Sequence, residues 1–265
     1  MPAAVVSTAN NVLQAILENG NLITIEAKDA YWALIYHRLK PRSFAQLLTP
    51  GDLIYVNKQN TAWQLDQLPK VQGALISLNT NTGFIDSLVG GFSYKLSHFN
   101  RVTQADRQSG SCFKPFIYTA ALDHGSTPAS IFNDAPVVIP SSGEDLLWRP
   151  ENANRKFNGP TSLRQGLTHS RNLVSIRVLR TIGIDYANQY IKKFGFNNQP
   201  KSLSLALGSG SVTPLKIATA YASFANTGFK IEPILINTII DQNGEVVFNQ
   251  NLNLPKRIIS AETAF

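Results

Sequence analysis

The 265-residue sequence is poor in cysteine and histidine and has no long hydrophobic run. Its single cysteine, Cys112, excludes internal disulfides, and its four histidines are too scattered to predict a structural zinc site. No apolar run reaches the roughly 18 residues that a membrane-spanning helix needs. The start, Met1-Pro2-Ala3-Ala4-Val5, lacks the basic and apolar regions of a secretory signal. We therefore expect no metal, no cofactor, and no signal or membrane anchor within these residues.

Charged residues are also few, at 15% of the chain, but they are unbalanced and give a formal net charge of +7 at pH 7. Such a charge can steer a protein toward membrane surfaces, cell-wall polymers or nucleic acid. The Lys and Arg residues are dispersed, with no long basic run interleaved with aromatic residues, so we expect a solvated basic surface and no nucleic-acid partner. With 43% hydrophobic residues, the chain can bury a sizeable core in one large domain or two unequal ones.

Residues 1–70 have the pattern of short strands separated by turns, with candidate strands at 4–7, 12–17, 21–25, 52–56 and 61–65. Asn19-Gly20 predicts a hairpin turn between the second and third strands, and Pro50-Gly51-Asp52 predicts another turn. A helical patch over 30–39 interrupts the strands. This pattern suits a small OB-like all-β segment that ends at Leu68-Pro69-Lys70.

Residues 71–265 predict a larger α+β domain. A β-hairpin is expected over 71–78 and 84–89, and the segment after Lys114 is apolar nearly all round, which marks a buried helix. The proline-rich stretch 128–160 is expected to be an irregular connection. Helices are expected over 162–167, 172–181, 186–194 and 213–225, and strands near 233–241 and 245–249. Strands at both ends with helices between them are typical of an α+β fold built around a central helix.

The chain's only Ser-x-x-Lys, Ser111-Cys112-Phe113-Lys114, lies where that buried helix begins. Residues three apart share one face of a helix, so Lys114 can lie close to Ser111. Serine becomes a good nucleophile when a base takes its proton, and a lysine shielded from water has a lowered pKa that suits it to be that base. A helix N-terminus also favours negative charge on an attacked carbonyl oxygen. The structural alternative is that Ser111 caps the helix and Lys114 is a solvated first-turn residue.

A second polar triplet, Ser170-Arg171-Asn172, precedes another apolar helix. A serine hydroxyl there can relay a proton between the lysine and a leaving amine, and an asparagine amide can hold the lysine and bind a substrate amide. The structural alternative is a pair of helix caps. We give no catalytic role to the earlier triplet Ser77-Leu78-Asn79, which is expected at a strand end.

The Ser-x-x-Lys and Ser-x-Asn motifs in this order resemble penicillin-binding proteins and serine β-lactamases. The flanking sequence is more specific and resembles class A penicillin-binding proteins over almost the whole chain. The segments that carry this resemblance are Leu88-Val89-Gly90-Gly91-Phe92, Phe99-Asn100-Arg101, the run from Lys114 to Ala121, Phe132-Asn133-Asp134-Ala135-Pro136, Trp148-Arg149-Pro150-Glu151-Asn152, Gly159-Pro160, Leu163-Arg164-Gln165-Gly166-Leu167, Phe194-Gly195-Phe196 and Leu205-Ala206-Leu207-Gly208.

The resemblance implies a transpeptidase domain over 71–265, after the end of an OB-type domain over 1–70. In a peptidoglycan D,D-transpeptidase, Ser111 would attack the penultimate D-Ala carbonyl of a stem peptide and form an acyl-enzyme. Lys114 would be the base, Ser170 the proton relay, and Asn172 a contact to substrate and lysine. β-Lactam antibiotics would acylate the same serine.

The resemblance further implies a parent protein with a glycosyltransferase domain and an N-terminal membrane anchor, on the periplasmic side of the bacterial inner membrane. An outer-membrane lipoprotein activator would be a further partner. The family's third motif, Lys-[Ser/Thr]-Gly on a strand beside the nucleophile, does not occur in these 265 residues. We therefore expect this chain to be a fragment, truncated before that strand and inactive on its own.

Two other classes of function stay open. One is an acyl-hydrolysing relative, a D,D-carboxypeptidase or β-lactamase, for which Glu144 and Glu151 are candidate deacylating residues between the two motifs. The other is a non-catalytic binding module.

Trp148 is a candidate for lining the substrate cleft or for packing the core. Cys112 is expected to fill a gap in the core as a small apolar residue.

Overall fold

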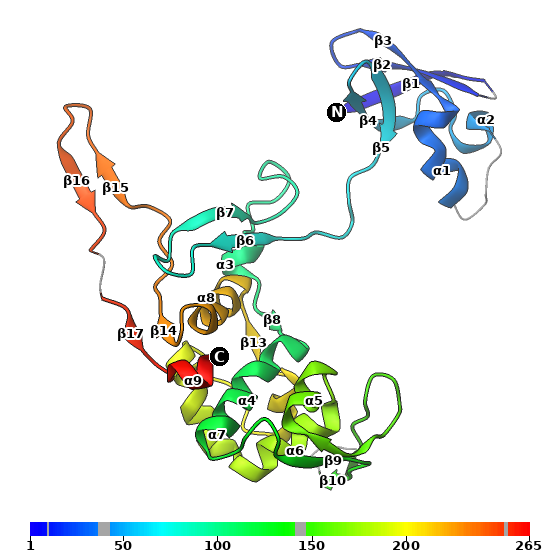
Figure 1. Cartoon of the computed structure of the whole chain (residues 1–265). Coiled ribbons are helices and arrows are strands. Elements are labelled where there is room, and N and C mark those ends of the chain that lie inside the picture. The colour runs from blue at the N-terminus through cyan, green and yellow to red at the C-terminus, as the bar shows by residue number, and fades with distance from the viewer. Residues whose placement is uncertain (10, 37–42, 141–146, 252–253) are drawn as a thin grey trace. The chain divides into compact units, whose positions relative to one another are not determined.

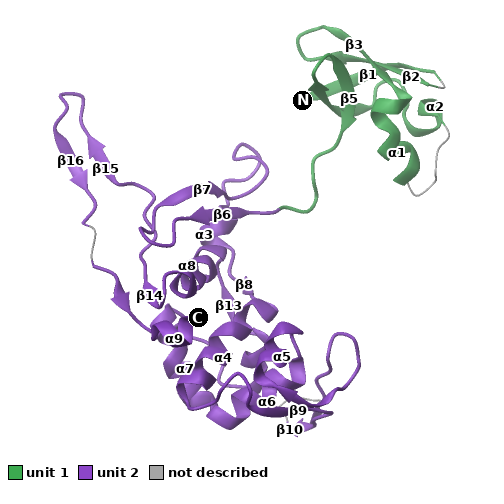
Figure 2. Cartoon of the chain, viewed as in Figure 1, with its two compact units in different colours: residues 1–72 green, residues 73–265 purple. Residues whose placement is uncertain are grey.

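The computed structural model describes residues 1–9, 11–36, 43–140, 147–251 and 254–265. The chain divides into two compact units, residues 1–72 and 73–265 (Figure 2). Its mixture of helices and strands agrees with the α+β expectation. Across the described residues, no helix has both the length and the apolar character needed to cross a membrane.

The first unit is a five-stranded antiparallel sheet in the order β3-β2-β1-β4-β5. Its elements are β1 (Pro2–Thr8), β2 (Val12–Leu17), β3 (Leu22–Glu26), a 3-10 turn η1 (Ala27–Ala30), α1 (Tyr31–Tyr36), α2 (Phe44–Leu47), β4 (Leu53–Gln59) and β5 (Ala62–Asp66). The end strands β3 and β5 contact each other, so the sheet curls on itself as an OB-type barrel does.

The five strands expected in this unit are all present, and the β2–β3 hairpin turns at Asn19-Gly20 with Gly20 at φ +83°. The helical patch expected over 30–39 is α1 in its described part, and its end at Leu39 lies outside the described residues. The four-residue helix α2 was not predicted from the sequence. It buries Phe44 completely in the core of the unit.

The second unit packs its helices around α4, which runs through the centre of the helical part in Figure 1. Its elements are β6 (Leu75–Leu78), β7 (Ile85–Val89), α3 (Arg101–Gln104), β8 (Arg107–Gln108), η2 (Gly110–Phe113), α4 (Lys114–Asp123), β9 (Ile131–Asp134), β10 (Ile139–Pro140), β11 (Leu147–Trp148), β12 (Gly159–Ser162), α5 (Leu163–Thr168), α6 (Asn172–Ile182), α7 (Ile184–Ile191), η3 (Lys192–Phe194), η4 (Leu203–Leu207), β13 (Ser211–Val212), α8 (Pro214–Ala225), β14 (Phe229–Lys230), β15 (Thr238–Ile240), β16 (Val246–Asn249), β17 (Lys256–Arg257) and α9 (Ala261–Ala264).

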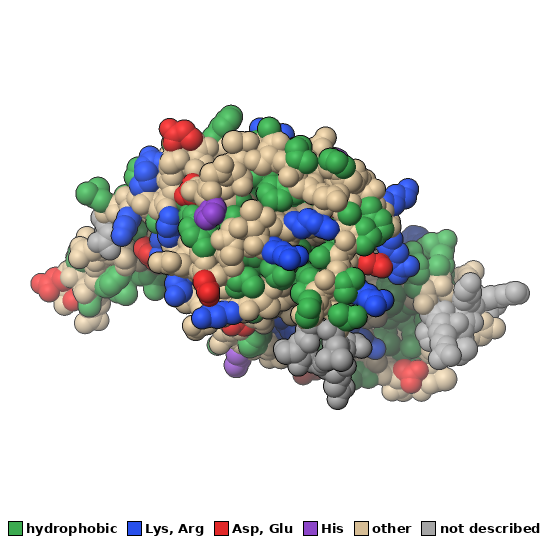
Figure 3. Space-filling model, turned by 90° about the horizontal axis from the view of Figure 1, so that it is seen from below, with side chains coloured by type: hydrophobic (Ala, Val, Ile, Leu, Met, Phe, Trp, Pro, Cys, Tyr) green, Lys and Arg blue, Asp and Glu red, His purple; other side chains and the backbone are tan. Residues whose placement is uncertain are grey.

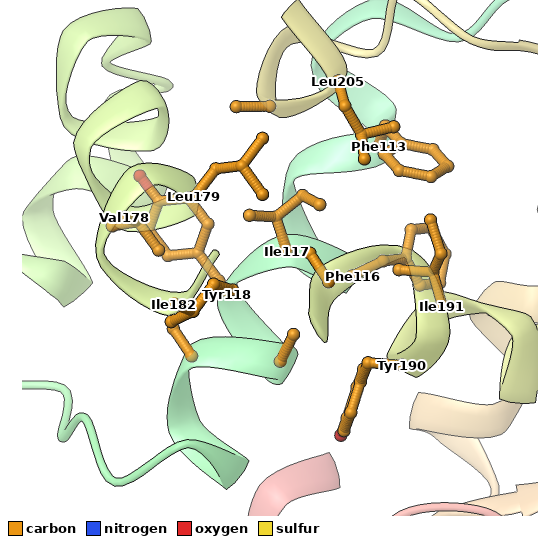
Figure 4. Close-up of a cluster of buried hydrophobic side chains, with 14 of the residues drawn as sticks. Phe113, Phe116, Ile117, Tyr118, Val178, Leu179, Ile182, Tyr190, Ile191 and Leu205 are labelled. Carbon is orange, nitrogen blue, oxygen red and sulfur yellow. The ribbon is translucent and has the colours of Figure 1, made fainter. Parts of the chain in front are cut away.

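The central helix α4 is buried nearly all round, as its apolar sequence predicts. It contacts α5, α6 and α7, and aromatic rings from η3 and α8 pack around Phe116. Figure 4 shows side chains of the η2–α4 segment meeting those of α6, α7 and η4, among them Phe113, Ile117, Leu179, Ile191 and Leu205, all with no exposed surface. The rigid core therefore extends directly to the turn that carries Ser111.

The expectation of an irregular connection over 128–160 is only partly right in its described part, because residues 149–158 contain no helix or strand but four short strands lie around them. Strand β9 pairs antiparallel with β12, from Ile131 opposite Ser162 to Asp134 opposite Gly159, and β10 pairs with β11. Each ladder has only two strands, so every strand has a free edge. Proline is tolerated there because its missing N–H need not pair.

The strands expected near both ends of the second unit are also present. Hairpins form from β6 with β7 and from β15 with β16, and the two are linked by a parallel bridge between Phe84 and Ile234. Within the described residues these strands form separate two-stranded ladders rather than one continuous sheet. Helix α8 begins as predicted, with the side chain of Thr213 capping it and Pro214 in its first turn.

Candidate active site

Ser111 lies in the 3-10 turn η2, which continues directly into α4 at Lys114. The next residue but one, Phe113, is fully buried and anchors the turn, while Ser111 itself is exposed. A close approach to η4 fixes the other side, because the backbone N–H of Gly110 donates to Gly208 O at 3.2 Å. Neither η2 nor α4 is capped by the Ser111 side chain, so the hydroxyl is not used as a helix cap.

Lys114 is almost completely buried, with 1% of its surface exposed. Its Nζ donates to Ser170 O at 2.7 Å, to Ser170 Oγ at 2.9 Å and to Asn172 Oδ1 at 2.8 Å. These three acceptors are neutral, and burial lowers the pKa of Lys114 to about 8. Lys114 is therefore not a solvated first-turn residue, and about one lysine in ten is neutral at pH 7.

Ser170 bridges the lysine and the nucleophile. Its Oγ donates to Ser111 Oγ at 3.0 Å and accepts from Lys114 Nζ. The backbone of Ser170 has φ +51°, a left-handed conformation that is uncommon for a residue other than glycine. Helix α5 ends here, with Ser170 N donating to Leu167 O and Arg171 N to Gly166 O. In this conformation both the carbonyl and the hydroxyl of Ser170 accept hydrogen bonds from Lys114. These two contacts favour a functional reason for the strained backbone of Ser170.

Asn172 is the first residue of α6 and contacts Lys114 through its side-chain carbonyl. Its amide nitrogen Nδ2 donates to Glu151 O at 2.8 Å, and its backbone N–H donates to Asn152 Oδ1 at 2.8 Å. The residue at the N-cap position, Arg171, makes no side-chain cap. The triplet is therefore not a pair of helix caps, since the side chains of Ser170 and Asn172 bond to the lysine instead.

The remaining sequence candidates lie elsewhere or have other partners. Trp148 is half-buried in β11, pairs with Ile139 and packs against the hydrophobic core. The Glu151 carboxylate is exposed and forms an ion pair with Arg155 at 3.7 Å, and Glu144 lies outside the described residues. In the Ser77-Leu78-Asn79 triplet, Asn79 Oδ1 accepts from the backbone N–H groups of the β6–β7 turn.

The expectation that Cys112 fills a gap in the core is wrong. Cys112 is exposed, because the 3-10 turn directs the neighbouring Phe113 inward in its place. The Cys112 carbonyl accepts a hydrogen bond from Tyr221 Oη at 2.8 Å, which ties the turn to α8.

Sequence reasoning gave no role to Asn152 and Asp134, two buried polar residues that stand behind Asn172. Both occur in segments that resemble the family, but their contact joins residues 18 apart across a bend of the chain and has no local signal. Among the residues that the structure describes, no group of three or more His, Cys, Asp or Glu side chains is placed to hold a metal ion. On the face shown in Figure 3, Lys and Arg side chains are scattered among neutral and apolar ones rather than gathered in a stripe.

Comparisons with known proteins identify the family of both units. Residues 73–265 match the family model described as the penicillin-binding protein transpeptidase domain, and residues 1–71 match the penicillin-binding protein OB-like domain. Penicillin-binding protein 1A of Pseudomonas aeruginosa is 49% identical over 214 residues, which are 80% of this chain and 26% of that protein. Penicillin-binding protein 1A of Escherichia coli is 42% identical over 255 residues, which are 94% of this chain and 30% of that protein.

The crystal structure of penicillin-binding protein 1A from Haemophilus influenzae superposes with a TM-score of 0.85 at 38% identity, covering 98% of this chain and 37% of that one. The chain thus spans about a quarter to a third of the length of the curated relatives named above. Because both family models and closely similar relatives cover almost all of its residues, the chain belongs to the penicillin-binding proteins, as an OB-like segment followed by a transpeptidase segment.

Proposed function

We propose that Ser111 is the acyl-forming nucleophile of a peptidoglycan D,D-transpeptidase, with Lys114 as its base, Ser170 as the proton relay and Asn172 as a contact to lysine and substrate. The observation that carries the proposal is the continuous path from Ser111 Oγ to Ser170 Oγ at 3.0 Å and on to Lys114 Nζ at 2.9 Å. The transpeptidase domain in this proposal lies within residues 73–265, after the OB-like unit.

The lysine can act as a base because of how its three hydrogen bonds are arranged. They use all three donors of a protonated ammonium group, so loss of one proton frees a lone pair. The hydrogen bond between Lys114 and Ser170 Oγ then reverses: Ser170 donates to Lys114 and accepts from Ser111. Two short proton transfers make Ser111 nucleophilic without direct contact between Ser111 and the lysine.

Acylation follows from this arrangement. Ser111 Oγ forms a bond to the carbonyl carbon of the penultimate D-Ala, while its proton passes through Ser170 to Lys114. The positive end of α4 favours the negative charge that develops on the carbonyl oxygen. When the tetrahedral intermediate collapses, the C–N bond to the terminal D-Ala breaks and the proton returns along the same path to the leaving amine.

In the second half of the reaction an amine of a neighbouring stem peptide attacks the carbonyl carbon of the acyl ester and gives a proton through Ser170 to Lys114. The ester C–O bond to Ser111 then breaks, and Ser111 Oγ regains a proton along the same path. A β-lactam ring would open by the same first step and remain as an ester. A penicillin-binding protein of Mycobacterium tuberculosis whose structure is an imipenem acyl-enzyme complex shares this fold, with a TM-score of 0.63 at 21% identity.

The absence of Lys-[Ser/Thr]-Gly from the 265 residues limits what this chain does alone. Loss of one oxyanion donor costs about 100- to 1000-fold in rate. Because the path from Ser111 through Ser170 to Lys114 is formed without that motif, we replace the expectation of an inactive chain with a narrower one: slow acylation by a reactive β-lactam but no cross-linking of stem peptides. For the whole protein we propose a glycosyltransferase domain, a periplasmic location with a membrane anchor, and a lipoprotein activator as partner.

Consumption of benzylpenicillin by the 265-residue chain tests the proposal. We expect loss of one equivalent of penicillin and then a stop, as a stable acyl-enzyme requires. Continued loss would favour the acyl-hydrolysing alternative, and no loss by a chain that circular dichroism shows to be folded would favour a binding module. Ser77→Ala, in the other Ser-x-Asn triplet, is the matched control and should behave as the unmodified chain, whereas Ser111→Ala should consume none.

A further inference from the structure

The helix that carries Asn172 is capped by a side chain from a distant part of the chain. Asn152 Oδ1 accepts from the backbone N–H of Asn172 at 2.8 Å and from that of Leu173 at 3.4 Å. The first N–H groups of a helix need such partners, and Arg171 at the N-cap position supplies none. The start of α6 is therefore fixed to the segment after β11 rather than by its own sequence.

A buried carboxylate determines which way the Asn152 amide faces. Asp134 has no exposed surface, and its Oδ1 accepts from Asn152 Nδ2 at 2.7 Å. Because a carboxylate only accepts hydrogen bonds, it holds the NH₂ end of the amide and leaves Oδ1 for α6. The second N–H of Asn152 donates to Lys156 O at 2.9 Å, so all donors and acceptors of this amide are used.

The other oxygen of Asp134 is held as well. Its Oδ2 accepts from Asn158 N at 3.2 Å and lies 3.7 Å from the guanidinium Nε of Arg171, a side chain that is 12% exposed. Arg171 stands between Ser170 and Asn172 in the sequence, so the same carboxylate also contacts the middle of the triplet. The pair Asp134–Asn152 thus supports the triplet through the helix cap and through an ion pair.

We infer that Asn152 and Asp134 are positioning residues for acylation: they fix the backbone and hence the side chain of Asn172, which in turn holds Lys114. This inference rests on the proposed function, because its effect is on the rate at which Ser111 is acylated. Neither residue is placed to touch the reacting atoms. A displaced Asn172 would lose its 2.8 Å contact to Lys114 and leave the lysine free to move out of line with Ser170.

Exchange of the two side chains tests the inference. Asn152→Asp alone places a second carboxylate against Asp134, and Asp134→Asn alone places an NH₂ group toward either Asn152 or the N–H of Asn158. The double variant Asp134→Asn with Asn152→Asp restores one donor facing one acceptor, keeps the net charge of the pair unchanged, and keeps an oxygen atom that can accept from the first N–H groups of α6. It loses the contact to Lys156 O, and it places a neutral amide where Asp134 forms its ion pair with Arg171.

We expect each single variant to be acylated by benzylpenicillin about 10- to 100-fold more slowly than the unmodified chain, since small displacements of catalytic groups have effects of this size. The double variant should recover at least about threefold over either single variant. Rates are compared well below each variant's thermal unfolding midpoint, so that a loss of stability alone does not slow the reaction. Equal rates in all folded variants, or a double variant no faster than the singles, would overturn the inference.

Amide hydrogen exchange at Asn172 and Leu173 separates this inference from the proposed function. Exchange should accelerate in Asn152→Asp and slow again in the double variant, whether or not penicillin reacts. If the unmodified chain is not acylated, the proposed function fails while the exchange data still test the cap. If the unmodified chain is acylated but exchange at both amides is the same in all variants, the inference alone fails.

Discussion

The protonation of Lys114 makes a quantitative prediction about the pH dependence of acylation. With a pKa of about 8, roughly one lysine in ten is neutral at pH 7, whereas a lysine with the ordinary value of 10.5 would be neutral in about one molecule in 3000. Burial therefore raises the amount of free base at pH 7 about 300-fold. If the neutral lysine accepts the proton from Ser111, the acylation rate follows this fraction.

The expected profile is a rise of about tenfold between pH 7 and pH 9, with a plateau above it. An unshifted lysine would instead give a rise of about 100-fold over the same range and no plateau. The second-order rate of penicillin adduct formation, measured at constant ionic strength, distinguishes the two. The rate for Ser111→Ala provides the correction for alkaline hydrolysis of the β-lactam.

Lys114→Arg is the control for this experiment, because a guanidinium stays protonated throughout the range. It should show no pH-dependent acylation while remaining folded by circular dichroism. An acylation rate that keeps rising tenfold per pH unit up to pH 10 would refute the role of a buried, partly neutral lysine. A Lys114→Arg variant with the same pH profile as the unmodified chain would refute it as well.

Three further predictions follow from the same contacts. The folded-state pKa of Lys114 is below its unfolded value, so the unfolded chain binds more protons between pH 8 and 10.5. The free energy of unfolding should therefore rise by about 2 kcal/mol from pH 7.5 to 9.5. Denaturant titrations should show this rise, and it should disappear in Lys114→Met. Ser170→Ala removes the relay and should slow acylation about 100-fold or more, without loss of the folded circular dichroism spectrum; an unchanged rate would exclude the relay. In Gly208→Ala the new Cβ would collide with Gly110 O, and φ at this position is +70°. The free energy of unfolding, measured in urea, should therefore fall by about 1–3 kcal/mol, and acylation of Ser111 should slow. An unchanged free energy of unfolding would show that the turn tolerates the contact.

Sequence spacing was sufficient to predict that Ser111 and Lys114 lie together where a buried helix begins, while their roles as nucleophile and base remain a proposal. Ser111 and Lys114 are neighbours along one short segment, and the apolar run that follows indicates that this segment begins a buried helix. The strands of the OB-like unit were likewise predictable, because each shows a local alternation and a turn signal such as Asn19-Gly20.

The parts that sequence did not predict depend on contacts between distant segments. The amide of Asn152 meets Asp134 and α6 only after the chain has folded, and no local pattern indicates that α6 is capped from 20 residues upstream. The left-handed backbone of Ser170 is also a tertiary effect, since serine itself does not favour φ +51°. The pairing of β9 with β12 was missed because the prolines between them are typical of loops.

The exposure of Cys112 was missed for a related reason. Cysteine is most often buried, so composition favours a core position. The 3-10 geometry of η2 instead places Phe113 in the core and leaves Cys112 at the surface next to Ser111. Side-chain direction in a turn of this length is set by the helix that follows, not by the preference of a single residue.

The most direct test of the central claim is the intact mass of the 265-residue chain after incubation with benzylpenicillin, followed by peptide mapping of the adduct. The account predicts one slowly formed adduct per chain, on the peptide that contains Ser111, absent from Ser111→Ala and retained in Ser77→Ala. A folded chain without an adduct, or an adduct that persists in Ser111→Ala, would contradict the assignment of Ser111 as the nucleophile.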